Sequence, residues 1–243
     1  MPTASDHDHD HSVVPAGRPA TVWPCQPATP DRRPAGWLQA AVERLVAICT
    51  RPGDPVLLLD PPSPAEAGPP TAAGDDTTGG FTETGWAVAR LGRPVQVRTA
   101  PADPAPRPAV SGPGPDPAFG PGPDTDRHTL VVTVVAPTRF GWFTHIPWSQ
   151  LVAPGGTLAV ITRSDSVAGW LIDPTIELTT AAWYGGLTLL DRIVLMEVPL
   201  DQLDQLDQLP TPIPTGMLAR RVHSDLLLFT TVSAPVPPGG EGW

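Results

Sequence analysis

A short apolar run between two groups of turn-forming residues sets the frame for this chain. Val56 to Leu59 reads Val-Leu-Leu-Leu, follows Pro52 and Gly53, and precedes Asp60, Pro61 and Pro62. An apolar run of this length bounded by turn signals predicts a buried strand. Ligands of open α/β sheets bind outside the carboxyl ends of the strands. The sequence therefore directs the search for a ligand site to Asp60.

Prolines divide the rest of the chain. There are 35 prolines and 23 glycines among 243 residues, and they are clustered rather than spread. Structured segments are therefore expected to alternate with linkers. The predicted divisions are a His/Asp-rich disordered tail (1–20), an N-terminal half-domain (21–99), a Pro/Gly-rich linker or insertion (100–127), a C-terminal half of the same domain (128–233) and a disordered tail (234–243).

Apolar periodicity predicts the elements within the two halves. Apolar residues at spacings near 3.6 predict helices, and short apolar runs predict buried strands. A packed arm at 21–24 comes first. Helices are expected over 34–50, 81–91 and 166–184, the last with Pro174 as an alternative start. A partly helical aromatic segment is expected over 140–152, and strands are expected over 56–59, 95–97, 130–135, 157–161, 187–198 and 222–232. Alternating strands and helices indicate an α/β layer fold.

Charge and composition narrow the function classes. All 15 basic residues are arginine, so Schiff-base chemistry and a P-loop lysine are excluded. The net charge of −10 disfavours nucleic-acid binding by this chain alone, leaving a protein or a small molecule as the expected partner. No signal peptide or run of about 20 apolar residues is present, so a cytoplasmic protein with no membrane association is expected.

Three stretches carry a family resemblance. Leu151 to Val160 is similar to an L-x-P-G-G-x-L-x-V turn, and Arg51 to Pro61 looks like an x-P-G-D-x-V-L-D-P opening. The segments 186–194 and 222–229 resemble the last two strands of the same proteins. Together they resemble class I S-adenosylmethionine-dependent methyltransferases, and in particular actinobacterial DNA-methylase-like proteins. The resemblance implies a doubly wound, Rossmann-like sheet with an antiparallel C-terminal hairpin, eroded in its first half.

The resemblance also implies site residues. S-adenosyl-L-methionine would be the cofactor, with Asp60, Pro61, Gly79 and Gly80 as its binding residues and Ala136, Pro137 and Thr138 at the position of the catalytic motif. Several family features are missing. Pro62 stands where a glycine-rich loop is expected, and no acid follows Val97 before Asp103. The segment 100–126 replaces a third strand, and the catalytic position lacks the family's polar and aromatic residues.

Several other residues could have either a functional or a purely structural role. His145 could act as a general base, although a structural role is favoured. Trp142 and Trp148 could line a substrate pocket or pack in the core, and His223 opens the last strand. The alternating Asp and His of residues 6–11 form either a metal-binding tract or a polar tail. Cys25 and Cys49 are too isolated for a metal site, so no metal site is predicted.

Two functional hypotheses therefore remain open. The first is a divergent methyltransferase that binds S-adenosylmethionine through Asp60 and the turn at Gly79 and Gly80. The second is a pseudoenzyme that keeps the sheet and acts as a non-catalytic interaction or scaffold protein. The missing motifs favour the second hypothesis where activity is concerned.

Overall fold

The structure is a computed structural model that describes residues 21–25, 36–62, 81–101, 127–167, 170–198 and 223–231. The Asp/His tract, the glycines at 79 and 80 and most of the Pro-rich linker lie outside these ranges. The elements are β1 (Thr21–Pro24), α1 (Gly36–Cys49), β2 (Val56–Asp60), α2 (Thr82–Arg90), β3 (Val95–Thr99), β4 (His128–Val134), the 3₁₀ helix η3 (Gly141–His145), α3 (Trp148–Leu151), β5 (Val152–Thr162), β6 (Asp165–Val167), β7 (Trp170–Ile172), α4 (Thr175–Tyr184), β8 (Leu187–Met196) and β9 (His223–Thr231).

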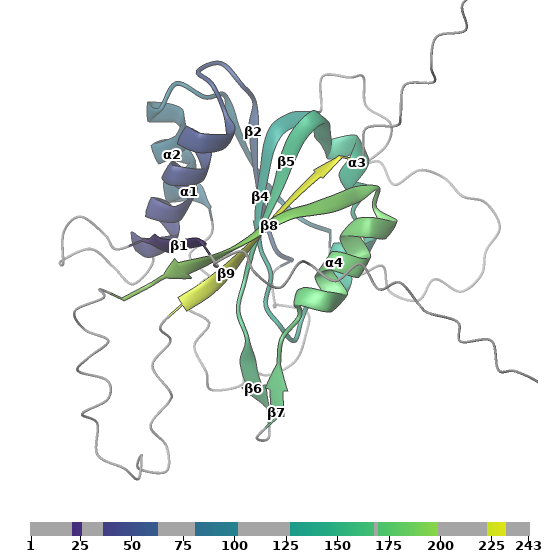
Figure 1. Ribbon diagram of the computed structural model, residues 1–243. Coiled ribbons are helices and arrows are strands. Elements are labelled where there is room, and N and C mark those ends of the chain that lie inside the picture. The colour runs from purple at the N-terminus through teal and green to yellow at the C-terminus, as the bar shows by residue number, and fades with distance from the viewer. Residues whose placement is uncertain are drawn as a thin grey trace, which may run out of the picture.

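Seven strands form one sheet in the order β1-β8-β9-β5-β4-β2-β3. The neighbours β3, β2, β4 and β5 are parallel, and β1 is parallel to β8. Strand β9 is antiparallel to both β5 and β8, between which it lies. Strand β9 is thus the one reversed strand in this sheet (Figure 1).

This topology confirms the predicted fold class. The sheet is mixed and mostly parallel, and its last two strands form the antiparallel pair that the methyltransferase resemblance implies. The two predicted half-domains both contribute strands to it, because β2 and β3 continue directly into β4 and β5. On the β3 side, the described residues supply no further strand.

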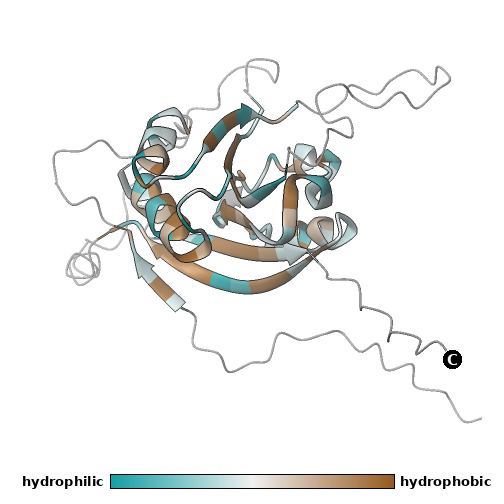
Figure 2. Ribbon diagram, turned by 90° about the horizontal axis from the view of Figure 1, so that it is seen from above, coloured by the Kyte–Doolittle hydropathy of each residue, from teal (hydrophilic) through white to brown (hydrophobic). Residues whose placement is uncertain are grey.

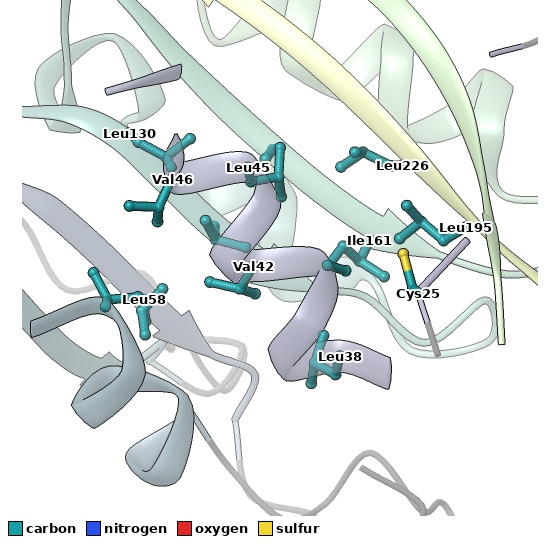
Figure 3. Packing of buried hydrophobic residues seen from close by; sticks show 14 of the residues in the cluster. Cys25, Leu38, Val42, Leu45, Val46, Leu58, Leu130, Ile161, Leu195 and Leu226 are labelled. Carbon is teal, nitrogen blue, oxygen red and sulfur yellow. The ribbon is translucent and has the colours of Figure 1, made fainter. Parts of the chain in front are cut away.

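Helices cover both faces of the sheet. One core layer lies between the sheet and α1 with α2, and includes Val42, Leu45 and Ile161 (Figure 3). The other lies between the sheet and η3, α3 and α4. Seen from above, the apolar strands lie between helices of mixed polarity (Figure 2). Alternate residues of a strand point to opposite faces, so β9 sends Leu226 to the first core and Leu227 to the second.

The predicted turn at Pro154, Gly155 and Gly156 interrupts the pairing of β5 with β4. His128 pairs with Val152, and the next pair joins Leu130 to Thr157, so the residues between loop out. A Cβ atom at Gly156 would lie 2.9 Å from the carbonyl oxygens of both Ala153 and Thr129. Only glycine fits such a close backbone approach, so the turn is structural, as predicted.

The helix predicted over 166–184 is wrong in its first part. The described residues around its start form the antiparallel pair β6–β7, and α4 begins at Thr175 after Pro174. Trp170, Leu171 and Ile172 are apolar in a way that suits a strand as well as a helix. Proline favours the first turn of a helix, and here it marks the true start.

The arm predicted at 21–24 is an edge strand. Strand β1 pairs with β8, and its Trp23 is buried beside Arg44, whose guanidinium carbon lies 4.7 Å from the ring centroid. The aromatic segment 140–152 is partly helical as predicted, because Pro147 separates η3 from α3. No helix within the described ranges is both long and apolar enough to cross a membrane.

Candidate functional site

Asp60 ties three elements together at the carboxyl end of β2. Its two carboxylate oxygens accept the backbone N–H of Phe81 at 3.0 and 3.3 Å. Its carbonyl oxygen accepts the N–H of Ala100 at 2.8 Å, just past the end of β3. Phe81 precedes α2 and is buried. The carboxylate therefore satisfies an N–H that would otherwise lack an intrahelical partner at the start of a helix.

The surroundings of Asp60 also set its protonation. Burial raises the pKa of this carboxyl above its ordinary value, and the hydrogen bond from Phe81 acts in the opposite direction. Pro61 is exposed and Pro62 is half-buried. Both predicted cofactor glycines, Gly79 and Gly80, lie outside the described residues, immediately before Phe81.

The predicted catalytic position is a tight turn after β4. Ala136 and Arg139 form an isolated antiparallel bridge, and the N–H of Arg139 donates to the carbonyl of Ala136 at 3.1 Å. Pro137 is buried in this turn and Thr138 is exposed. Of the three predicted residues, Thr138 alone carries a polar side chain. The turn thus lies at the carboxyl end of β4, and the Thr138 hydroxyl is on its surface.

Two buried threonine hydroxyls near the carboxyl ends of the strands bond to backbone carbonyls of neighbouring strands. Thr133 donates to the carbonyl of Leu59 at 2.8 Å, and Thr162 donates to the carbonyl of Val135 at 2.9 Å. Both threonines are almost fully buried. These hydroxyls fix neighbouring parallel strands to one another and do not face a ligand.

The described residues supply few of the polar groups that S-adenosylmethionine would need. The carboxylate that they place at the end of β2 has both oxygens bonded to Phe81. At the end of β3, Thr99 and Ala100 stand where the family carries an acid for the ribose hydroxyls.

The aromatic candidates belong to the core. Trp148 is 1% exposed, and its indole N–H donates to the carbonyl of Phe143 at 3.0 Å. The Phe143 and Trp148 ring centroids lie 4.6 Å apart. Trp142 is also buried. The core alternative is thus the one that the structure bears out for both tryptophans.

A cleft of about 490 Å³ lies elsewhere, between η3–α3 and the end of α4. Ser149 and Gly186 on its wall come just before β5 and β8 begin, so it adjoins the amino ends of these strands. Asp60 is at the opposite, carboxyl end. The cleft is lined partly by His145, Ile146, Pro147, Ser149, Ala181 and Tyr184. His145 is therefore distant along the strands from Asp60.

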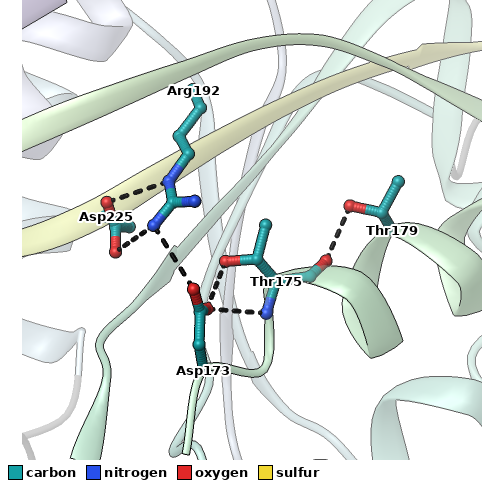
Figure 4. Close-up of polar contacts among 5 residues, drawn as sticks. All are labelled: Asp173, Thr175, Thr179, Arg192 and Asp225. Atoms are coloured by element: carbon teal, nitrogen blue, oxygen red, sulfur yellow. Dashed lines mark hydrogen bonds and ion pairs between the residues drawn. The ribbon is translucent and has the colours of Figure 1, made fainter. Parts of the chain in front are cut away.

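Sequence reasoning missed one polar cluster. Arg192 of β8 donates to both carboxylate oxygens of Asp225 on β9, from Nε at 3.2 Å and Nη2 at 3.1 Å (Figure 4). Its Nη2 also lies 3.6 Å from Asp173, which accepts the N–H of Thr175 at the start of α4. Asp225 is 2% exposed. An acid inside the apolar run of β9 was the available signal.

The charges of this cluster support one another. Hydrogen bonding to Asp225 raises the pKa of Arg192. Burial acts to raise the pKa of Asp173, but the hydrogen bonds from Thr175 and the charge of Arg192 outweigh it and lower that pKa. The cluster joins β8, β9 and α4, which is a structural role. Within the described residues no group of three or more His, Cys, Asp or Glu side chains could hold a metal ion.

Neither a protein-family model nor a curated protein matches this sequence. Three solved structures resemble the fold. A functionally unknown protein from Deinococcus radiodurans R1 is 14% identical, with 83% of this chain and 89% of that chain covered and a TM-score of 0.32. A putative methyltransferase from Bacillus halodurans C-125 is 13% identical (78% and 96% covered, TM-score 0.35). The antibiotic-resistance methyltransferase Kmr is 12% identical (81% and 93% covered, TM-score 0.36). At these TM-scores the likeness carries no argument, and the fold assignment rests on strand order and direction.

Proposed function

We propose that this methyltransferase-like protein acts as a non-catalytic interaction or scaffold protein. The contact between Asp60 and Phe81 is the observation that carries the proposal. A single backbone N–H shared between the two oxygens orients the carboxylate toward α2 and uses part of its acceptor capacity, which leaves fewer of its lone pairs for a ligand's donors. Asp60, at the end of β2, thus stabilises the start of α2.

The turn after β4 supports the same proposal. Enzymes that methylate an amine hold the amino group through polar side chains next to the methyl donor. Ala136 and Pro137 offer no side-chain donor or acceptor. The exposed hydroxyl of Thr138 is a single group on a surface turn, and one such group does not orient a reacting amine.

A second candidate function is an S-adenosylmethionine-dependent methyltransferase related to the DNA methylases. The strand order favours it, because Asp60 and Pro61 stand at the carboxyl end of a strand central to a doubly wound sheet. Gly79 and Gly80 directly precede the segment that begins α2. In this function they would approach the cofactor.

The partner of the proposed scaffold is a protein or a small molecule. A net charge of −10 repels the phosphate backbone of nucleic acids. The charge thus separates this chain from the DNA methylases that its motifs resemble.

Titration calorimetry of the full chain with S-adenosylmethionine separates the two functions. The scaffold function predicts no saturable heat up to about 1 mM ligand. A dissociation constant below about 100 μM, or roughly −5.5 kcal/mol, would overturn it. In that case Gly80→Val should weaken binding, and an unchanged affinity would remove the glycine assignment. Val22→Thr, on an exposed strand remote from Asp60, is the matched control.

A further inference from the structure

The sheet has two edge strands, β1 and β3. An edge strand presents backbone N–H and C=O groups that can pair with another chain, and proteins usually blunt such edges with prolines, short strands or bulges. The two edges differ in how far they are blunted, and this difference identifies an interaction surface.

Strand β1 is blunted. The N–H of Cys25 donates to the carbonyl of Met196, so residues 21, 23 and 25 turn their backbone groups toward β8. Residues 22 and 24 then face outward, because successive residues of a strand alternate. Pro24 has no N–H, which leaves Val22 as the one outward donor of this four-residue strand.

Strand β3 is short and carries the charged Arg98, but it has neither an internal proline nor a bulge. The N–H of Val56 donates to the carbonyl of Pro94, and the N–H of Ala100 donates to the carbonyl of Asp60, both at 2.8 Å. These bonds turn the backbone groups of residues 94, 96, 98 and 100 toward β2. Val95, Val97 and Thr99 therefore direct both N–H and C=O outward. The register of β3 with β2 runs without a bulge.

The described part of the chain places no strand against this outer side of β3. Val97, at the centre of the strand, is 41% exposed, and Gln96 and Thr99 are exposed as well. Val and Thr have high β-propensity. Five regular residues, of which three have outward amides and none is proline, are a template for one more strand.

We propose that β3 pairs with the β3 of a second copy of this chain, antiparallel, about a two-fold axis at Val97. The side chains support this partner and this direction. Val97 faces Val97 of the partner, Val95 faces Thr99, and Gln96 faces Arg98, so no like charges are opposite one another. A parallel in-register pair would place the two Arg98 guanidiniums side by side, which is unfavourable.

The antiparallel register also satisfies the backbone. Val97 and its symmetry mate, and Val95 and Thr99, become hydrogen-bonded pairs that exchange both N–H···O bonds. A two-fold interface of this kind closes on itself and does not propagate into a fibre. The two seven-stranded sheets then form one continuous sheet. The dimer would give the proposed scaffold protein a partner, but it does not depend on the scaffold function. Sedimentation tests the dimer and calorimetry tests cofactor binding, so either proposal can fail without the other.

Sedimentation equilibrium of the full chain tests the proposal. The wild type is expected to be a dimer at about 50 μM. Because each copy carries a net charge of −10, added salt should strengthen the dimer by screening repulsion. A wild-type chain that stays monomeric at about 200 μM overturns the proposal.

Proline variants locate the interface. Val97→Pro removes an outward N–H that β2 does not use, so it should weaken the dimer at least 10-fold while the circular dichroism spectrum stays native. Val97→Thr keeps the amide and should remain dimeric. Thr99→Pro removes an outward N–H near the strand end and is the second variant if Val97→Pro fails to fold. Dimers of undiminished affinity in both folded proline variants would overturn the assignment of β3.

Gln96→Pro is the contrasting variant. Its N–H faces β2 and belongs to the sheet ladder, so its loss should lower the urea midpoint of unfolding. Monomer formation by Val97→Pro with a urea midpoint that falls much less than that of Gln96→Pro, measured at a concentration where the wild type is also monomeric, supports the outward assignment. An equal loss of stability in the two variants contradicts it.

Discussion

The strands in the two halves of the sheet differ in length and burial. On one side β5, β9 and β8 have 11, 9 and 10 residues and pair along most of their lengths. On the other side β2 and β3 have 5 residues each. Strand β2 is buried except at its end, whereas β3 is mostly exposed. We therefore expect the long C-terminal strands to contribute more to the stability of the fold than β3 does.

This contrast bears on the proposed non-catalytic function, because the sheet can stay intact when side chains at its ends change. The central strands β2, β4 and β5 contribute buried residues to both cores, with Leu58, Val131 and Val160 fully buried. Burying such side chains is the dominant favourable term in folding. Substitutions at the end of β3, or in the turn after β4, would leave that apolar area intact.

The largest expected effect tests where the stability lies. Phe229→Ala in β9 removes a ring that is 0% exposed and should lower the free energy of unfolding by about 3–5 kcal/mol. Val97→Ala in β3 should cost about 1 kcal/mol or less, because this side chain is partly exposed. Urea denaturation of monomeric samples measures both. Equal losses would contradict the contrast between the two sides.

A smaller effect is expected from the polar cluster. Arg192→Met leaves Asp225 buried and without the two bonds from Arg192. Removing one partner of a buried pair is costly, but the Arg192 side chain is 44% exposed and water screens part of the interaction. We expect a loss of about 1–3 kcal/mol, measured by urea denaturation. The double variant with Asp225→Asn should recover part of it, and no recovery would count against the pairing.

The pH dependence should differ in sign between the two sides. Asp173 has a lowered pKa, so its contribution to stability is present above its ordinary pKa and is lost as pH falls. Asp60 has a raised pKa, so its contribution is largest at low pH and is lost as pH rises through that raised value.

Between about pH 3 and about pH 7, Asp173→Asn should therefore flatten the rise of the urea midpoint with pH. Asp60→Asn should steepen it, and its amide oxygen can still accept the Phe81 N–H. Slopes that change in the same direction in both variants would contradict these assignments.

The smallest effect concerns the two thiols and leaves stability unchanged. Burial raises the pKa of Cys25 to about 11, against the opposing charge of Arg44, and burial also raises the pKa of Cys49. Thiolates are the reactive species, so both residues should react slowly with a thiol reagent at neutral pH. Cys49 is only partly buried and should react first. Faster labelling of Cys25 would show that β1 opens readily.

The sequence predicted those parts of the fold that depend on local pattern. The apolar runs at 56–59 and 130–135 and the turn at Gly156 could be found because each carries its own signal. The hairpin β6–β7 could not, since Trp170 to Ile172 suits a helix and a strand equally. The pairing of β1 with β8 was also hidden, because it joins segments about 170 residues apart.

The candidate site was predictable in position but not in use. Asp60 was expected at the carboxyl end of a central strand, and it is there. Its hydrogen bond to Phe81, 21 residues further along the chain, depends on tertiary structure and has no local signature. The same limit applied to Arg192 and Asp225, which are 33 residues apart in sequence.

The hydrogen bond between Asp60 and Phe81 makes the segment between these two residues a suitable place to insert a second domain. It holds the two flanks of residues 61–80 together through contacts that lie outside the segment. The entropy of closing a loop grows only with the logarithm of its length, so a longer insert adds little strain to the sheet. We expect a fluorescent or enzymatic domain inserted between these flanks to leave the sheet folded.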